Sequence, residues 1–411
     1  MIIFPKYGAL RGEVHLPSSK SESNRYLLLH ALAGSGPEPE HLSEANDTRL
    51  LKRLLQQIRN KEHSTLNAED AGTVLRFLAP YIAAMPGSDF ILTGAARLCE
   101  RPMSPLIDAL RTLGADIVCL EREGFAPLRI RGRELQGGTV HVAADQSSQF
   151  ISALCLLAPT LPLGLHIIWE GEAVSAPYIG WTLQVLKAYG VKTQWETRGL
   201  FIPFQPIEPR PVRIAADWSS ASFFFCMAML APHTELLLRD LRIPSPQADA
   251  RMETWVQHFG IRVIQESEGI RIINTCEPFS PEPRCFDVSD CPDLAIPFIT
   301  ACALRFPMMS FTGLHTLDLK ESPRLQVLCE ELKNAGCVLR LEGEVLFFGP
   351  LEERGAMPAS LKTRGDHRMA MSFALAALMG ITVSLDDADC VRKSFPGYWE
   401  QLRALGFICQ Y

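Results

Sequence analysis

Positively charged side chains recur near the starts of helix-like segments along this 411-residue chain. Lys20 and Arg25 flank the first such start, and His367 and Arg368 open the last apolar one. Others occupy matching places further along the chain: Arg76, Arg101, Lys320, Arg324 and Lys393. Helix starts favour negative charge, and Arg forks and Lys ammonium groups suit phosphate and carboxylate. A single such charge is most often a solvated surface group, but the recurrence indicates binding of small, multiply charged anions.

The elements that would position these cations come from a repeated unit. Five glycines end amphipathic helix-like segments and recur every 70 or 76 residues: Gly114, Gly190, Gly260, Gly336 and Gly406. A glycine just past a helix end commonly adopts the left-handed C-cap conformation. Their regular return indicates that one supersecondary unit has been copied along the chain.

A second series of segments, apolar on every face, alternates with the first. Their markers are 72 to 76 residues apart, except for a first step of 51: Ser21, Gly72, Ser148, Ser220, Asp293 and His367. Such segments predict buried helices, and the small polar residues at their starts suit N-caps. Alternating stretches before most of them predict strands. The unit is predicted to run strand, polar loop, buried helix, strand, polar loop, glycine-capped surface helix.

Six units are too many for one hydrophobic core, so the chain is predicted to be an α/β protein with two domains of three units each. The crossing is expected near residues 215–217, after a Pro-rich stretch at residues 201–211. If the units are arranged alike, the helix starts and cations gather at one end of each domain. The anion site is therefore expected in a cleft between the domains.

Composition excludes several other classes of protein. The chain is 47% hydrophobic and 21% charged with a net charge of −6, and it has no 18-residue apolar span. Its start has neither a signal-peptide nor a transit-peptide pattern, so a cytoplasmic location is expected. An acidic chain with scattered basic residues is a poor candidate for binding nucleic acid. The 12 cysteines lack metal-ligand spacing and are predicted to be buried reduced thiols, not zinc ligands or disulfides.

Nine short segments in chain order span nearly the whole sequence. They are LPSSKSESNR (16–25), DAGTVLRFL (70–78), RPMSPL (101–106), DQSSQF (145–150), SAPYI (175–179), PDLA (292–295), LKESPRL (319–325), GDHRMAM (365–371) and KSFPGYW (393–399). Together they resemble the signature set of the 5-enolpyruvylshikimate-3-phosphate synthase family. One such segment would be a weak signal, whereas nine in order are highly specific.

The resemblance implies two inside-out α/β barrel domains, each with three β-α-β-α-β-β-type units. It places residues 18–215 in an N-terminal domain that mainly binds shikimate 3-phosphate. Residues 1–17 and 216–411 would form a C-terminal domain that mainly binds phosphoenolpyruvate and supplies acid and base groups. The implied enzyme is a monomer of the shikimate pathway, leading to chorismate and aromatic amino acids, and a glyphosate target. It transfers the enolpyruvyl group of phosphoenolpyruvate to the 5-hydroxyl of shikimate 3-phosphate, with no metal or organic cofactor.

The resemblance also implies the site residues. Those for shikimate 3-phosphate are Lys20, Ser21, Arg25, Ser147, Ser148, Gln149, Ser175, Asp293 and Lys320. Those for phosphoenolpyruvate are Lys20, Gly72, Arg101, Gln149, Arg324, His367, Arg368 and Lys393. Glu321 would give a proton to the methylene carbon and remove one from it, Asp293 would take the proton of the 5-hydroxyl, and Lys20 would stabilise charge or share the proton transfer. From residue types alone, Asp293 is better explained as a helix cap, and Glu321 as a surface group, than as catalytic residues.

Two positions depart from the family pattern. Asp70 stands where Asn is usual and is predicted to be a helix N-cap, and Thr316 replaces an Asn that contacts shikimate in the family. Asp70 leaves the degree of glyphosate sensitivity open, and Thr316 leaves one shikimate contact open.

Two other functions remain as alternatives. One is the related transferase acting on UDP-N-acetylglucosamine, which uses a cysteine in a glycine-rich loop several residues before the Arg-Pro pair; here Cys99 is only two residues before Arg101. The other is a catalytically silent anion-binding or scaffold protein.

Overall fold

A computed structural model describes residues 1–60, 62, 64–143, 145, 147–171, 175–196, 199–277, 284–350 and 359–411. Gln146, within one of the nine sequence segments, lies outside the described residues. In the part of the chain that the structure describes, no helix is long and apolar enough to cross a membrane.

The chain forms two compact units. The N-terminal unit is Ser19–Ile214, and the C-terminal unit combines Met1–Ser18 with Ala215–Tyr411. Each boundary lies one residue from the position expected from the sequence. Each unit has its own core of buried apolar side chains, so the chain leaves the C-terminal unit after residue 18 and returns at residue 215.

The N-terminal unit contains two four-stranded sheets of identical topology. One has the order β3-β4-β6-β5 and the other β7-β8-β10-β9, each with one parallel pair followed by an antiparallel hairpin. Their strands are β3 (Thr65–Asn67), β4 (Asp89–Thr93), β5 (Asp116–Cys119), β6 (Leu128–Arg131), β7 (Gly138–Ala143), β8 (Leu165–Glu170), β9 (Gln194–Glu196) and β10 (Gly199–Ile202).

The C-terminal unit contains three four-stranded sheets with that same pattern, in the orders β2-β11-β13-β12, β14-β15-β17-β16 and β18-β19-β1-β20. Their strands are β1 (Ile2–Ile3), β2 (Arg11–His15), β11 (Glu235–Arg239), β12 (Ile261–Gln265), β13 (Gly269–Asn274), β14 (Cys285–Asp287), β15 (Ser310–Thr312), β16 (Leu339–Glu342), β17 (Val345–Phe348), β18 (Ala359–Leu361), β19 (Val383–Leu385) and β20 (Cys409–Gln410). The strands β1 and β2 therefore complete sheets whose other strands come from the second half of the chain.

The first repeat differs from the expected unit. Among the described residues from 19 to 64, the only strand-type pairing is an isolated parallel bridge between Glu40 and Arg213. The expectation of six units built alike is therefore wrong for the first. The short step of 51 residues explains this, since it leaves too little chain for a second strand and a hairpin.

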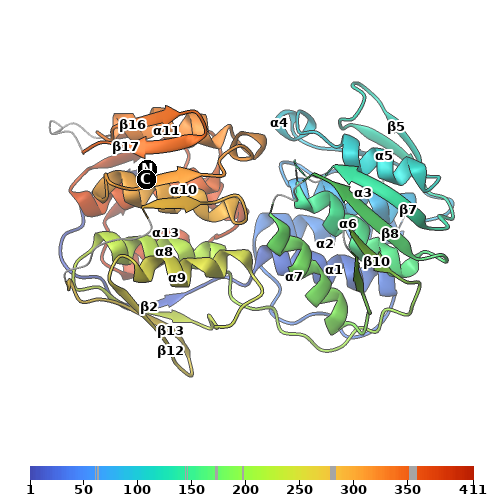
Figure 1. The fold of residues 1–411 in the computed structure, drawn as a ribbon, viewed down its shortest axis with the longest axis horizontal. Helices are drawn as coiled ribbons and strands as arrows, with labels where there is room; N and C mark the ends of the chain where they lie inside the picture. The colour runs from blue at the N-terminus through green and yellow to red at the C-terminus, as the bar shows by residue number, and fades with distance from the viewer. Residues whose placement is uncertain are drawn as a thin grey trace. The chain divides into compact units, whose positions relative to one another are not determined.

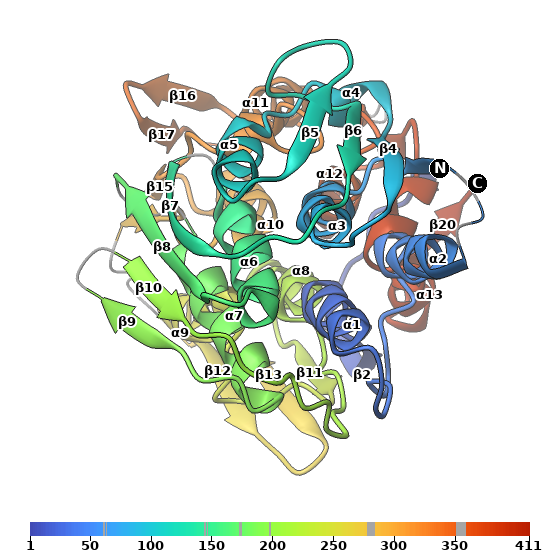
Figure 2. The same ribbon diagram turned by 90° about the vertical axis from the view of Figure 1, so that its right-hand side faces the viewer.

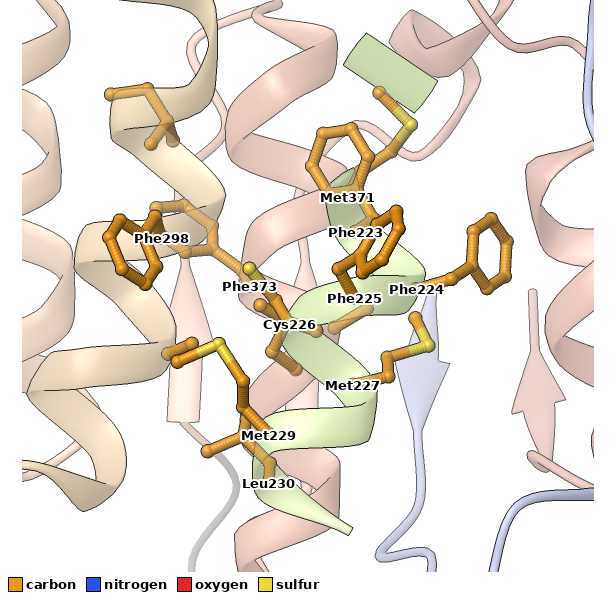
Figure 3. Packing of buried hydrophobic residues seen from close by; sticks show 14 of the residues in the cluster. Phe223, Phe224, Phe225, Cys226, Met227, Met229, Leu230, Phe298, Met371 and Phe373 are labelled. Carbon is orange, nitrogen blue, oxygen red and sulfur yellow. The ribbon is translucent and has the colours of Figure 1, made fainter. Parts of the chain in front are cut away.

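Six buried helices fill the two cores. The N-terminal unit has α1 (Lys20–Ala33), α3 (Gly72–Ala83) and α6 (Ser148–Leu157), and Figure 2 shows these three grouped inside the strands. The C-terminal unit has α8 (Trp218–Leu230), α10 (Pro292–Arg305) and α12 (His367–Phe373), and α8 and α10 run beside one another in Figure 1. Side chains of α8 pack with Phe298 of α10 and with Phe373 of α12 (Figure 3).

Shorter or amphipathic helices cover the cores. They are α2 (Asn46–Asn60), α4 (Ala96–Cys99), α5 (Ser104–Thr112), α7 (Ala176–Ala188), α9 (Met252–Gln257), α11 (Arg324–Asn334) and α13 (Tyr398–Ala404). The five repeated glycines follow α5, α7, α9, α11 and α13, with φ between 74° and 94°. After α5, Gly114 donates to the carbonyl of Arg111 and Ala115 to that of Leu110, which is the Schellman pattern. The predicted glycine caps are confirmed.

Side chains cap four of the six buried helices at their starts. Ser19, Ser147, Asp217 and Asp366 accept backbone N–H groups at the starts of α1, α6, α8 and α12. The predicted N-cap role of Asp70 is wrong, because α3 begins at Gly72 and its cap residue is Ala71, with no side-chain bond. Instead, the backbone N–H of Ala71 donates to the Ala68 carbonyl, so a turn directly precedes α3.

Candidate functional site

Arg25 is a nearly buried cation at the start of α1, with 3% of its surface exposed. Its Nε donates to the Thr182 hydroxyl at 2.8 Å, and its Nη1 donates to the Ser21 carbonyl at 2.9 Å. The guanidinium also lies over the rings of Trp181 and Phe77. These partners fix the fork while keeping its charge, which suits a group held ready for an anion.

Burial lowers the pKa of Arg25 to about 10, and the charges of Tyr178 and Glu22 offset only part of that effect. The protein environment therefore undercompensates this positive charge. A bound phosphate beside it would restore the missing stabilisation.

Lys20, one helical turn from Arg25, forms an ion pair. Its Nζ lies 2.9 Å from Oδ2 of Asp47 at the start of α2, and the two side chains are 16% and 4% exposed. The carboxylate holds the ammonium group at the N-terminus of α1, where the helix dipole also favours anions. Sequence reasoning missed Asp47 because an acid in the first turn of an amphipathic helix looks like a surface group.

Gly72, at the start of α3, lies against two arginines. A Cβ atom at this position would be 2.7 Å from Nη1 of Arg101 and 2.8 Å from Nη1 of Arg76. Arg76 also donates to Oε1 of Gln149 at 2.8 Å, which joins α3 to the start of α6. The amide nitrogen Nε2 of Gln149 donates to the Thr73 hydroxyl at 3.2 Å. Glycine is therefore the residue that lets both guanidinium groups approach the helix start.

The four predicted serines lie at helix starts of the same unit, and Ser21 is the second residue of α1. Ser147 accepts the backbone N–H of Gln149 as the cap of α6, and Ser148 is the first residue of that helix. Ser175 precedes α7 in the left-handed region, with φ of 56°. Arg25 links its helix to α7, because Nη2 donates to the Tyr178 carbonyl at 3.5 Å. In the N-terminal unit, the starts of α1, α6 and α7 thus occur together with Lys20, Arg25 and the two arginines beside Gly72.

Arg324 is the centre of a second cluster, in the C-terminal unit. Its Nε donates to Asp366 at 2.8 Å, its Nη1 to Asp293 at 3.2 Å and its Nη2 to Glu321 at 2.8 Å. Burial alone would lower the pKa of Arg324, but these three carboxylates outweigh it and raise the pKa well above its ordinary value. All three nitrogens of this guanidinium therefore already donate to acids of the protein.

Asp293 in the first turn of α10 bridges two arginines. Its Oδ2 lies 2.9 Å from Nη2 of Arg368, and its main-chain carbonyl accepts from Nη1 of Arg368 at 3.0 Å. Burial would raise the pKa of this carboxyl, but the charges of Arg368, Lys320 and Arg324 hold it well below the ordinary value. Asp293 is therefore ionised, and can accept a hydrogen bond from a hydroxyl group.

Glu321 lies between two cations. Besides Arg324, it faces Lys393, whose Nζ is 3.9 Å from Oε1 of Glu321. Nδ1 of His367 lies 3.7 Å from Oδ1 of Asp366, so this ring also belongs to the cluster. Of the predicted residues of this unit, the structure thus brings together Asp293, Lys320, Glu321, Arg324, His367, Arg368 and Lys393.

Comparison with known proteins identifies the family of the chain. The family model for EPSP synthase (3-phosphoshikimate 1-carboxyvinyltransferase) matches residues 5–402. The chain belongs to the EPSP synthase family. A Bacteroides fragilis 3-phosphoshikimate 1-carboxyvinyltransferase is 38% identical, with 97% of this chain and 96% of the relative covered. A Klebsiella pneumoniae protein of that name is 33% identical, with 97% of each covered.

Solved structures share the EPSP synthase fold. An EPSP synthase from Acinetobacter baumannii superposes with a TM-score of 0.75 at 21% identity, over 98% of each chain. The enolpyruvyl transferase NikO from Streptomyces tendae gives a TM-score of 0.72 at 15% identity, over 99% of this chain and 97% of that one. The mixed α/β architecture predicted from the sequence is therefore confirmed.

This EPSP synthase family member holds a further carboxylate that sequence reasoning left without a role. Asp366 is fully buried, caps α12 through the backbone N–H of Arg368 and accepts from Arg324 and Ser322. It lies inside a quoted segment, Gly365–Met371, next to His367 and Arg368. Its position beside two assigned cations was the signal that could have identified it.

Within the described ranges, no group of three or more His, Cys, Asp or Glu side chains could hold a metal ion. The 12 cysteines are all free thiols, but the predicted burial is wrong for Cys276 and Cys285, which are exposed. Cys99 closes α4 and donates to the Gly94 carbonyl at 3.5 Å, so its sulfur contacts the local backbone. Thr316 is buried and precedes the 3-10 helix η3 (Leu317–Leu319).

Proposed function

We propose that this protein transfers the enolpyruvyl group of phosphoenolpyruvate to the 5-hydroxyl of shikimate 3-phosphate and releases phosphate. The supporting observation is the contrast between the two clusters. One holds cations beside helix starts, which suits phosphate binding, and the other holds carboxylates between cations, which suits proton transfer. Membership in the family adds the identity of the two substrates.

Each unit has a part in this proposal. The N-terminal unit mainly binds shikimate 3-phosphate through Lys20, Ser21, Arg25, Ser147, Ser148, Gln149 and Ser175, with Asp293 and Lys320 from the C-terminal unit. Phosphoenolpyruvate is bound by Lys20, Gly72, Arg101, Gln149, Arg324, His367, Arg368 and Lys393. Each unit is an inside-out α/β barrel, and the reaction takes place in the cleft between them. The enzyme acts as a monomer in the cytoplasm.

The reaction proceeds by addition and then elimination. In the addition step the 5-hydroxyl oxygen bonds to C2 of phosphoenolpyruvate, Asp293 takes the hydroxyl proton and Glu321 gives a proton to the methylene carbon. In the elimination step Glu321 removes a proton from that carbon, the bond from C2 to the phosphate oxygen breaks, and phosphate leaves. Lys20 stabilises negative charge on the phosphate or shares in proton transfer near the phosphate. Donors held in place around such developing charges are typically worth about 3 kcal/mol each.

The partners of Glu321 support its role. The ammonium group of Lys393 and the guanidinium of Arg324 face this carboxyl, and 19% of its side chain is exposed. These contacts hold the Glu321 carboxyl between two of the cations that are proposed to bind phosphoenolpyruvate, which is where a proton donor to its methylene carbon is needed.

Phosphate release tests the proposed function. The purified protein is mixed with phosphoenolpyruvate and either shikimate 3-phosphate or UDP-N-acetylglucosamine, after treatment with a chelator. We expect release only with shikimate 3-phosphate and no effect of the chelator. Release with the nucleotide sugar would assign the chain to the related transferase, and no release with either would leave a silent binding protein.

The variant Glu321→Ala separates an enzyme from a binder. General acid–base catalysis typically contributes about 10²- to 10⁴-fold, so kcat is expected to fall by that factor. Affinity for shikimate 3-phosphate, measured by titration calorimetry, is expected to stay within about threefold of wild type. The exposed Asp108 of α5, changed to Asn, provides a control whose turnover should be unchanged.

A further inference from the structure

A surface cavity in the N-terminal unit is lined by residues to which the proposed substrate sites give no role. It has a volume of about 570 Å³, and its walls are α7 and the chain that follows this helix as far as Trp195 of β9. Figure 2 shows α7 beside the hairpin of β9 and β10. Pockets that hold small molecules commonly have volumes of about 300–1,000 Å³, so this cavity is large enough for one.

Trp195 supplies an aromatic wall of this cavity. It lies on the edge strand β9, opposite Leu200 of β10, which in turn pairs with Ile167 of β8. Residues that pair directly share one face of a sheet, and both of these partners are buried. Trp195 is nevertheless 60% exposed. A large ring on the apolar face of the sheet is therefore left open at the cavity.

The position of Trp195 has counterparts in two other repeats, where a helix cation contacts it. In the sixth repeat, Tyr411 lies five residues after the C-cap glycine and Arg403 three residues before it. The Arg403 guanidinium lies over the Tyr411 ring, 5.8 Å from its centroid. In the second repeat, Arg111 and Cys119 hold the same two positions, and Arg111 donates to the Cys119 sulfur at 3.9 Å. In these repeats the cation and the edge-strand residue therefore leave no room between them.

In the third repeat the same pair is Lys187 and Trp195, and both line the cavity instead. Among the described residues, the ring partner of Trp195 is Trp169, in a T-shaped arrangement with centroids 5.9 Å apart. Lys192 adds a second ammonium group, and the Gln205 side chain holds its main-chain N–H and carbonyl at 2.8 and 2.9 Å. Neither lysine forms an ion pair with a described residue, so both charges are available to an anion.

We propose that this cavity binds a small aromatic carboxylate, whose ring lies against Trp195 and whose carboxylate meets the ammonium groups of Lys187 and Lys192. The buried side chains of Leu183 and Val191 supply an apolar lining for the ring, and aromatic rings pack favourably on one another. A simple anion would leave Trp195 uncovered, and a neutral ring would leave both lysines unpaired. The site does not depend on enolpyruvyl transfer, because none of these residues is assigned to the substrates.

Titration calorimetry of the full chain with 2-naphthoate tests this proposal. Two further probes separate its parts, because cyclohexanecarboxylate has the charge without the aromatic ring and 2-naphthylmethanol has the ring without the charge. We expect 2-naphthoate to bind about tenfold more tightly than either of them. Its affinity should fall as the salt concentration is raised from about 0.05 M to about 0.5 M, because salt screens exposed charges.

Variants of the cavity locate the bound probe. Trp195→Ala should weaken binding of 2-naphthoate about tenfold, whereas Trp195→Phe keeps a ring and should stay within about threefold of wild type. Lys187→Gln should lower both the affinity and its dependence on salt. The matched controls are Tyr411→Ala and Lys52→Gln, which remove an exposed ring and an exposed ammonium group outside the cavity and should leave binding unchanged. Thermal unfolding of each variant checks that it is folded.

Three results would overturn the proposal. The first is no binding of 2-naphthoate at up to about 5 mM, and the second is an affinity that Trp195→Ala leaves unchanged, which would place the probe elsewhere on the chain. The third is a dimer, detected by light scattering, that Trp195→Ala dissociates, because a second copy of the chain would then occupy the cavity. Equal binding of 2-naphthylmethanol would remove the role of the lysines. Phosphate release decides the proposed function separately, whatever these titrations show.

Discussion

Arg25 of the N-terminal unit and Arg324 of the C-terminal unit are both nearly fully buried, yet their environments act on them in opposite directions. Burial dominates at Arg25 and lowers its pKa to about 10. At Arg324 burial is outweighed by Asp366, Glu321 and Asp293, which raise its pKa. A hydroxyl, carbonyl groups and aromatic rings hold the first, whereas carboxylates hold the second.

This difference indicates that the same repeated scaffold supports two kinds of chemistry. A cation held by neutral groups keeps its field for a bound anion. A cation held by several carboxylates stabilises those acids in their ionised form and tunes them for proton transfer. We infer that the first kind serves binding and the second serves catalysis.

The largest expected effect concerns stability. Arg324→Ala leaves buried carboxylates without their counter-charge and should lower the free energy of unfolding by about 3–5 kcal/mol. Arg25→Ala removes an undercompensated buried charge, so its loss should be much smaller. Urea unfolding of both variants and of the wild type measures the difference. Equal losses would break the comparison between the two arginines.

Affinity for shikimate 3-phosphate should depend more on Arg25 than on Arg324. Arg25→Ala is expected to weaken binding of shikimate 3-phosphate by about a hundredfold, since truncating a buried charged partner of an anion costs 2–5 kcal/mol. Arg25→Lys keeps the charge but loses the forked guanidinium, so its affinity should lie between that of the wild type and that of Arg25→Ala. Titration calorimetry with shikimate 3-phosphate alone gives both values. Affinity unchanged in Arg25→Ala would remove the binding role of this residue.

A smaller effect is expected at Gly72. The added methyl group of Gly72→Ala would come within 3 Å of the Arg76 and Arg101 guanidinium groups and displace them. The KM for phosphoenolpyruvate should rise about tenfold, the equivalent of 1.4 kcal/mol, with the melting temperature nearly unchanged. Gly114→Ala is the matched control, since open space surrounds that position and only the left-handed C-cap suffers. Its effect should be on stability and not on KM.

The smallest effect is the pH dependence of stability. The pKa of Asp249 is raised to about 7 in the folded protein from its ordinary value of 3.8, so the folded state binds the extra proton between these values. Its contribution to stability is therefore lost as pH rises through this range. Asp249→Asn should lack that loss, and its melting temperature relative to wild type should increase from about pH 5 to about pH 8. A difference that does not vary with pH contradicts the raised pKa.

The repeat and its helices were predictable because their signals are local. A glycine such as Gly336 marks a helix end by its own backbone preference, and segments such as 218–230 are apolar on every face. The sheet differences of the first repeat were not predictable in detail. The short spacing between Ser21 and Gly72 shows that this repeat has fewer residues than the others, but not which strands it fails to form.

Side-chain networks were less predictable than the helices. The nine segments supplied residue types, but the burial of Asp47, Asp249 and Asp366 depends on what packs over them. An acidic residue in the first turn of a helix has the same local sequence whether its side chain faces water or an arginine. The three carboxylates around Arg324 therefore emerge only from the packing of the segments that carry α10, α11 and α12.

The strand β1 lies beside the last strand of the chain, since Ile2 pairs with Gln410 and Ile3 with Cys409. During synthesis on the ribosome, the sheet that contains β1 can close only when the final residues have emerged, while the N-terminal unit is already complete. Joined ends would change that order. A circular permutant that links Tyr411 to Met1 and begins at Ala215 would make the C-terminal unit one continuous segment, translated first and able to fold before the rest.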